Sequence, residues 1–239
     1  MRLMDIMSDL TPTGILRASI NLGNLVLAQG TETTPSGVTV DIARELGTRL
    51  GVPVELLCFQ AARESFDAVN QGNADICFLA IEPARAETIA FTAPYVVIEG
   101  VFVVAKSSSM TSSTEADQPG VRIGVNEGSA YDLFLSRTLA HAQLVRASDG
   151  VLAFTEQQLE ATAGIRQPME AFVASHPGLR LVEPRFMEIQ QAVGTPRTRQ
   201  AATISFLHTF VEELKADGFI ADALHRSGQY DANVAPPAA

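Results

Sequence analysis

Cysteine, basic residues and long apolar segments are all scarce in this chain, and each shortage excludes a class of protein. The 239 residues contain two cysteines, Cys58 and Cys77, too few and too far apart for a disulfide scaffold or a metal cluster. Both lie in apolar runs, so we interpret them as small buried hydrophobic residues. Lysine and arginine number 17 against 27 acidic residues, a formal net charge of −10, which argues against nucleic acid or an anionic membrane surface as a partner. No apolar run approaches the ~20 residues that cross a bilayer.

Short apolar runs alternate with helical patterns along the chain, in an otherwise ordinary globular composition with 46% hydrophobic and 18% charged residues. In the first half this alternation predicts strands at 15–21, 52–59, 74–81 and 96–106, and helices after residue 37, at 62–71 and from Pro83. The polar composition of the next segment, SSSMTSSTEADQPG, predicts a surface loop. Beyond it we expect strands or extended segments at 121–125, 144–145, 160–165, 179–182 and 189–193, and helices at 129–139, 153–159, 168–176 and within 199–225.

This order of elements predicts an α/β fold with two lobes, each a mostly parallel sheet flanked by helices. The polar loop separates two sheets, and the last helices have no sheet of their own, so the chain must return to the first lobe. We therefore expect lobe 1 to comprise 1–98 and 194–239 and lobe 2 to comprise 99–193. Two hinge crossover strands would join the lobes and leave a cleft between them.

Five segments resemble, in order and spacing, the solute-binding proteins of ABC importers, those with the type II periplasmic binding fold in family 3, the amino-acid-binding type. They are GILRASI, SGVTVDIARELGTRLGVPVEL, AVNQGNADICFLA, EPARAETIAFTAPY and RIGVNEGSAYDLFL. The most specific piece is R-x-x-x-I-x-F-T-A-P-Y downstream of G-N-A-D-I. The resemblance implies a monomer that closes about its hinge on a small carboxylate-bearing ligand, without a cofactor or metal, and delivers it to a membrane permease.

The same resemblance implies a periplasmic location. The N-terminal stretch MRLMDIMSDLTPTGILRASI lacks an apolar h-region and a small-residue cleavage site, so it is not a secretory signal as written. A cytoplasmic location therefore stays open.

Arg85, the arginine of the specific block, is the residue that the family uses to hold the ligand carboxylate. A planar guanidinium suits this role because it meets both carboxylate oxygens at once. Pro83 opens the same helix, which would add backbone N–H groups. The alternative is a surface arginine paired with Glu82 or Glu87; the resemblance favours the binding role.

The same family resemblance implies further candidate ligand-binding residues. Gly128 and Ser129 come between a strand and a helix, where backbone N–H groups attract an anion; a plain helix cap by Ser129 explains them equally well. Asn24 lies where the family places contacts at the rim of the cleft, but an asparagine in a turn has the same appearance.

Three departures from the family pattern concern the ligand. Phe78 and Ala80 replace a small residue and a threonine, and Phe78 is either an aromatic face for the ligand or part of the core. Arg166, followed by Gln167, stands where the family places an aspartate for the ligand's ammonium group. A cation there attracts a second anion, so we hypothesise an amine-free acid such as a dicarboxylate or a keto acid. A solvated charge at Arg166, and a counter-charge from Glu82, are the alternatives.

An enzyme is the second functional hypothesis. The sequence contains no G-x-S-x-G, H-E-x-x-H or Walker lysine motif, and its four histidines lie away from the expected cleft. The same fold nevertheless hosts cyclohexadienyl dehydratases, which also act on anionic substrates, and Glu82 or Glu127 would be their acid–base group.

Overall fold

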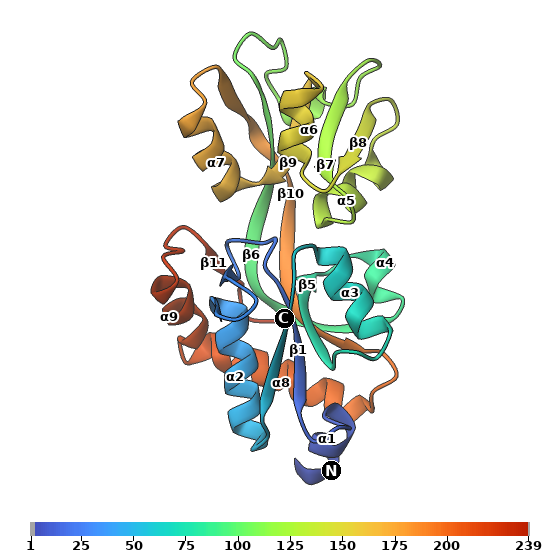
Figure 1. The fold of residues 1–239 in the computed structure, drawn as a ribbon, viewed down its shortest axis with the longest axis vertical. Helices are drawn as coiled ribbons and strands as arrows, with labels where there is room; N and C mark the ends of the chain where they lie inside the picture. The colour runs from blue at the N-terminus through green and yellow to red at the C-terminus, as the bar shows by residue number, and fades with distance from the viewer. Residues whose placement is uncertain (1–2, 239) are drawn as a thin grey trace. The chain divides into compact units, whose positions relative to one another are not determined.

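The computed structural model describes residues 3–238, and the chain divides into two compact units. Unit 1 comprises Met1–Val97 and Gln190–Ala239, and unit 2 comprises Ile98–Ile189. Residues 1, 2 and 239, which the sequence analysis assigned to lobe 1, lie outside the described residues. The long strands β6 (Ile89–Ala105) and β10 (Leu179–Pro196) each run from one unit into the other (Figure 1).

In unit 1 the strand order is β4 (Val54–Phe59), β1 (Leu16–Asn21), β5 (Ile76–Ala80), then β10 and, beside it, β6. β1 runs parallel to both β4 and β5, and β10 runs antiparallel to β5. Every residue of β5 is buried, as its unbroken apolar sequence predicts for a central strand. The carboxyl ends of β4, β1 and β5 therefore meet at one edge of the sheet, and the segments that follow them begin there.

Among residues 3–238, unit 1 has six helices: α1 (Leu3–Leu10), α2 (Val38–Leu50), α3 (Ala62–Asn70), α4 (Pro83–Ala86), α8 (Ala201–Ala216) and α9 (Phe219–Arg226). Its remaining strands are short: β2 (Gln29–Gly30) pairs with β3 (Pro35–Ser36), and β11 (Asn233–Val234) pairs with β6.

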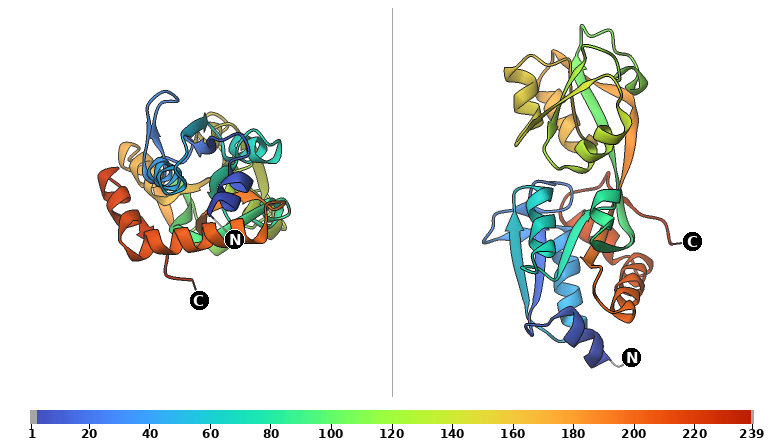
Figure 2. Two further views of the ribbon diagram at one scale, coloured as in Figure 1. Left: turned by 90° about the horizontal axis from the view of Figure 1, so that it is seen from below. Right: turned by 90° about the vertical axis from the view of Figure 1, so that its right-hand side faces the viewer.

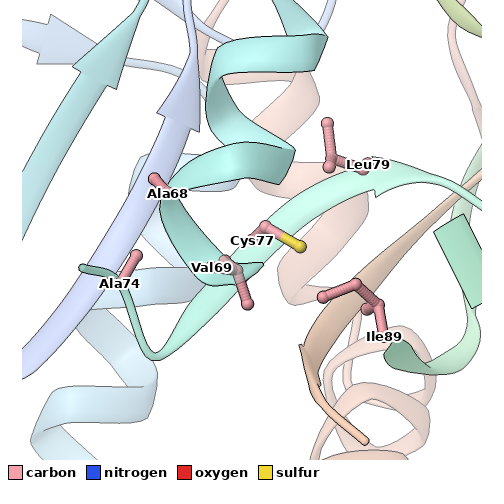
Figure 3. Packing of buried hydrophobic residues seen from close by; sticks show 6 residues of the cluster. All are labelled: Ala68, Val69, Ala74, Cys77, Leu79 and Ile89. Carbon is pink, nitrogen blue, oxygen red and sulfur yellow. The ribbon is translucent and has the colours of Figure 1, made fainter. Parts of the chain in front are cut away.

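Helices α2 and α3 follow directly from the sequence pattern. The apolar side chains of α2 recur at helical spacing, and the helix ends at Gly51, whose φ of 69° is the left-handed conformation that glycine adopts without steric cost. α3 packs on the sheet through Ala68 and Val69, which form a buried cluster with Cys77 and Leu79 of β5 (Figure 3). Burial raises the pKa of the Cys77 thiol to about 12, so this cysteine belongs to the core rather than to a reactive site.

Helix α1 is an element that the sequence analysis did not predict. It lies beside the long helix α8, drawn in orange in Figure 2. The Arg199 guanidinium donates to the Asp9 carbonyl oxygen, and the Gln200 N–H donates to the Asp9 carboxylate over 2.9 Å. These contacts fix the end of α1 to the start of α8.

A buried carboxylate ties β1 and the start of β5 to the segment before α8. The Asp75 carboxylate accepts hydrogen bonds from the Arg17 N–H (3.0 Å) and guanidinium (2.8 and 3.1 Å) and from Arg199 Nη2 (3.0 Å). Two guanidinium groups thus offset the cost of burying this charge.

In unit 2, β9 (Ala161–Ile165) lies between β6 and β7 (Arg122–Asn126) in the strand order of the sheet, and β8 (Gln143–Ala147) follows β7. β7 runs parallel to β8 and β9, and β6 runs antiparallel to β9. The helices of this unit are η1 (Ser113–Glu115), α5 (Ala130–Thr138), α6 (Gly150–Glu156) and α7 (Arg166–Ser175).

Alternating side chains of β6 pack on the two faces of this sheet. Val101 and Val103 form a buried cluster with Met169 of α7. Between them, Phe102 stacks on Phe186 with ring centroids 4.3 Å apart, and Phe186 contacts Phe134 of α5 at 6.0 Å. Helices therefore cover both faces.

Two elements differ from the sequence prediction for local reasons. The extended segments expected at 179–182 and 189–193 are parts of one continuous strand, β10. α6 begins at Gly150 rather than at 153, because the Asp149 side chain caps it by accepting from the N–H groups of Val151 and Leu152. Among residues 3–238, no helix combines the length and hydropathy needed to cross a membrane.

Candidate functional site

Three of the residues expected to bind a ligand from unit 1 follow strands that end at the same edge of its sheet. Asn24 lies three residues beyond β1, and Glu82 and Arg85 lie two and five residues beyond β5. β1 and β5 are parallel neighbours, with Ala18 opposite Ile76, so their following segments start at the same edge. In α/β sheets this edge is where ligands bind.

Arg85 lies on the four-residue helix α4 and is only 3% exposed. Its Nη1 donates to the Ala80 carbonyl oxygen over 3.2 Å, which holds the side chain against the end of β5. Burial is the main influence on the guanidinium and lowers its pKa, while the nearby Cys77 and Glu82 act in the opposite direction. The surface position that the sequence analysis allowed for Arg85 is therefore not the one observed.

Glu82 is the N-cap residue of α4 and is also 3% exposed, although its side chain makes no capping hydrogen bond. Asn24 is 6% exposed, and its buried Oδ1 has no hydrogen-bond partner among the described residues. Unit 1 thus buries a cation, a carboxyl group and an amide acceptor along one edge of a sheet.

Phe78 and Ala80 are interior residues of β5. Phe78 is 2% exposed and packs edge-to-face on Tyr95, with ring centroids 6.3 Å apart. This is the core position that the sequence analysis gave as the alternative to a ligand contact. Ala80 contributes the carbonyl oxygen that orients Arg85.

Gly128 and Ser129 follow β7 at the corresponding edge of unit 2. The Ser129 Oγ accepts from the Asp132 N–H over 3.1 Å, which makes Ser129 the N-cap of α5. The Gly128 N–H in turn donates to the Asp132 carboxylate over 2.9 Å, and Arg146 Nε pairs with that carboxylate at 2.9 Å. An anion that approached this helix end would compete with the carboxylate of Asp132.

Arg166 is the first residue of α7, directly after β9, and half-buried Gln167 follows it. Its guanidinium contacts three carboxylates of its own unit: Glu99 at 2.5 Å, Glu183 at 2.7 and 2.9 Å, and Glu170 at 3.4 Å. These contacts raise the pKa of Arg166, with Glu183 as the largest cause. Arg166 is therefore neither a solvated charge nor an uncompensated one.

Glu99 and Glu183 were not predicted from the sequence as partners of Arg166. Gly100 lies opposite Ile165 in the β6–β9 pairing, which brings Glu99 beside Arg166. The only sequence signal for Glu99 is a carboxylate within the apolar strand VVIEGVFVVA. Within the part of the chain that the structure describes, no group of three or more His, Cys, Asp or Glu residues is arranged to hold a metal ion.

The family model of bacterial extracellular solute-binding proteins, family 3, matches residues 26–228. No curated protein sequence matches the chain significantly.

Three solved structures are similar in fold. Holo ArgBP from T. maritima is 22% identical with a TM-score of 0.73, covering 90% of this chain and 98% of its own. AbpA from Streptococcus pneumoniae, an amino acid ABC transporter substrate-binding protein bound to L-arginine, is 18% identical with a TM-score of 0.76, covering 92% and 97%. The ancestral amino-acid-binding protein AncCDT-1, a precursor of cyclohexadienyl dehydratase, is 19% identical with a TM-score of 0.74, covering 94% and 97%.

Proposed function

Because the chain belongs to the bacterial extracellular solute-binding proteins of family 3, we propose that it binds a small carboxylate-bearing solute for an ABC importer. The solute is an amino acid or an amine-free organic acid, and the membrane permease of the importer is the partner that receives it. The proposal includes a periplasmic location, in agreement with the family's description as extracellular. It also includes the hinged closure of an interlobe cleft on the ligand expected from the sequence, during which β6 and β10 would bend.

The position of Arg85, buried at the carboxyl edge of the sheet, is the observation that carries this proposal. This edge is where α/β sheets bind ligands, and the two oxygens of a carboxylate match the planar fork of guanidinium donors. The hydrogen bond to Ala80 holds this fork in place before the ligand arrives, which lowers the entropy lost on binding.

Asn24 and Glu82 support the proposal from the same edge of the sheet, each as a buried polar group close to Arg85 in the topology. The hypothesis of an amine-free acid depended on an uncompensated cation at Arg166. Because three carboxylates contact that guanidinium, its charge no longer favours an amine-free acid over an amino acid.

Isothermal titration calorimetry tests the proposal with a panel that includes L-arginine, L-lysine, L-glutamate, glutarate and α-ketoglutarate. We expect at least one acid to bind, and the Arg85→Gln variant to bind it at least about 30-fold more weakly, as expected when one partner of a buried charge pair is removed. Arg44→Gln, at an exposed arginine of α2, is the matched control and should change the affinity less than about twofold. Unchanged affinity in Arg85→Gln would overturn the proposal.

A dehydratase acting on prephenate or arogenate is the second candidate. The burial of Glu82 favours this activity, since a buried carboxyl group near a guanidinium is suited to acid–base chemistry on an anionic substrate. Glu127, the other carboxylate considered, is exposed. Loss of prephenate or arogenate in the presence of the protein, and its abolition in Glu82→Gln, would establish this activity in place of the binding role.

A further inference from the structure

The last segment of the chain returns to β6 at the point where that strand leaves unit 1. β11 pairs antiparallel with β6, with Asn233 opposite Val97. Beyond this pair, the Ala235 N–H donates to the Tyr95 carbonyl oxygen over 3.0 Å. Val97 is the last residue of unit 1 before β6 enters unit 2. The tail, residues 228–238, therefore holds β6 up to the boundary of its unit.

This pairing gives β6 a second neighbouring strand in unit 1. In the strand order of that unit β6 comes last, after β10, and β11 is the further strand that pairs with it. In unit 2, β9 pairs with β6 from Gly100 to Val103. Ile98 and Glu99 lie between the two pairings and are opposite no residue of β9 or β11. Backbone without such pairing opens more readily, so the freedom of β6 to bend is concentrated at these two residues.

Contacts on either side of the boundary narrow this freedom further. The Glu99 carboxylate binds the guanidinium groups of Arg166 and Arg185 at 2.5 and 3.1 Å, and all three residues belong to unit 2. On the second crossing strand, the Ile81 N–H donates over 2.9 Å to the carbonyl oxygen of Gln190, the first residue of unit 1 on β10. Both crossing strands are thus fixed close to the boundary, β10 by the end of β5 and β6 by the tail.

Lys215 of α8 fastens the tail and β6 to the same helix. Its side chain is only 4% exposed, and its Nζ donates to the carbonyl oxygens of Pro236 in the tail (2.8 Å) and Pro94 in β6 (3.2 Å). The same nitrogen lies 2.5 Å from Glu212 Oε1. An ammonium group has three donors, and burying it is costly unless acceptors compensate. Here the three acceptors come from three different segments of unit 1, so one side chain joins them.

Glu212, which lies one turn before Lys215, attaches the tail a second time. Its Oε2 accepts a hydrogen bond from the Ala238 N–H over 3.1 Å. Burial acts to raise the pKa of this carboxyl group, but the hydrogen bonds from Lys215 and Ala238 outweigh it, and the pKa is lowered. Within residues 228–238 the regular structure is limited to the two residues of β11, so these side-chain contacts order the rest of the tail.

We propose that the tail and Lys215 form a clamp that ends the flexible part of β6 at Val97 and confines its bending to Ile98 and Glu99. The role of this clamp in binding rests on the hinged closure included in the proposed function. By limiting the arrangements open to the ligand-free protein, the clamp lowers the conformational entropy that closing on a ligand removes. None of the residues proposed to bind the ligand belongs to it.

Hydrogen exchange of the ligand-free protein tests whether the tail protects β6. Alternate residues of an antiparallel strand point to the same neighbour, so the amides of Tyr95 and Val97 both face β11. Peptides that cover both should exchange at least about tenfold faster in Lys215→Met and in a chain shortened to end at residue 230, and peptides of β5 should not change. Lys106→Met, at the other lysine of the chain, exposed just beyond β6, is the matched control.

Electron-spin distance measurements test whether the clamp restricts the hinge. Nitroxide labels are placed on the exposed positions Arg44→Cys of unit 1 and Arg137→Cys of unit 2, in a Cys58→Ser background. Cys77 is fully buried and therefore stays unlabelled. We expect the distance distribution of the ligand-free protein to become at least about 1.5-fold wider in Lys215→Met and in the shortened chain, and to stay unchanged in the control variant.

Faster exchange in β6 without a wider distance distribution would show that the tail covers the strand but does not restrict the hinge, and would overturn the inference. Unchanged exchange in the shortened chain would overturn it as well. Circular dichroism shows whether each variant is folded, and the shortened chain keeps the test decisive if Lys215→Met unfolds. None of these measurements uses a ligand, so a failure of the acid panel would overturn the binding function alone.

Discussion

Arg166 and Glu183 form a two-point ion pair, with Nη1 2.7 Å from Oε1 and Nη2 2.9 Å from Oε2. The remaining guanidinium nitrogen, Nε, donates to Glu99 over 2.5 Å. One side chain thus connects the start of α7 to both long strands, β6 and β10, within unit 2. The hydrogen bond from Arg166 also holds the pKa of the Glu183 carboxyl below its ordinary value.

Arg166→Gln should therefore lower the free energy of unfolding by about 1 kcal/mol, the upper range for partly exposed pairs with bidentate geometry. The effect should shrink as salt is raised from about 0.05 to 1 M, because the pairs are partly exposed to solvent. Urea unfolding at both ionic strengths measures it. Arg137→Gln, at an exposed arginine of α5, serves as the control. A loss of stability that did not depend on salt would point to lost packing instead of lost charge.

We expect Asp117 to make the stability of unit 2 depend on pH in the acid range. Its carboxylate accepts from three consecutive backbone N–H groups, those of Ala140, His141 and Ala142, at 2.7 to 2.9 Å. These hydrogen bonds favour the charged form and lower the pKa of Asp117 to about 2.

The folded-state pKa lies below the unfolded value of about 3.9, so the stabilisation by Asp117 is complete above about pH 4 and disappears as pH falls through about 2. Melting temperatures measured between pH 2 and 6 should fall less steeply for Asp117→Asn than for the unmodified protein. Parallel pH profiles for the two proteins would contradict this account.

Gly124 allows the backbone of β7 to approach α6. A Cβ at this position would lie 2.4 Å from the Gly150 carbonyl oxygen, a backbone atom that cannot move aside without shifting the helix. Gly124→Ala should cost about 1 to 3 kcal/mol in urea unfolding, the usual penalty for overpacking.

Gly178→Ala is the matched control in the same unit, because a Cβ there meets no atom within 4 Å. It should change the stability by less than about 0.5 kcal/mol. Equal effects at the two glycines would show that contact with Gly150 is not the cause.

The spacing of apolar residues along the sequence predicted many of the helices and strands. The apolar spacing and Gly51 predicted α2, and the unbroken apolar run predicted the buried strand β5. The family resemblance and the α/β fold with type II periplasmic binding topology are both confirmed, by the family model and by the similarity to solved structures. The same pattern did not predict α1, whose position depends on contacts with Arg199 and Gln200, about 190 residues later in the chain.

The sequence by itself determined the alternation of strands and helices and the family, and it predicted Arg85 as a ligand contact, because these depend on neighbouring residues and on short motifs. Only the tertiary structure decided that Arg85 and Glu82 are buried together and that Arg166 is held by Glu99 and Glu183. The physical reason is that burial and charge compensation depend on which strand ends meet. Arg166 and Glu99 are 67 positions apart in the chain, and the pairing of β6 with β9 brings them into contact.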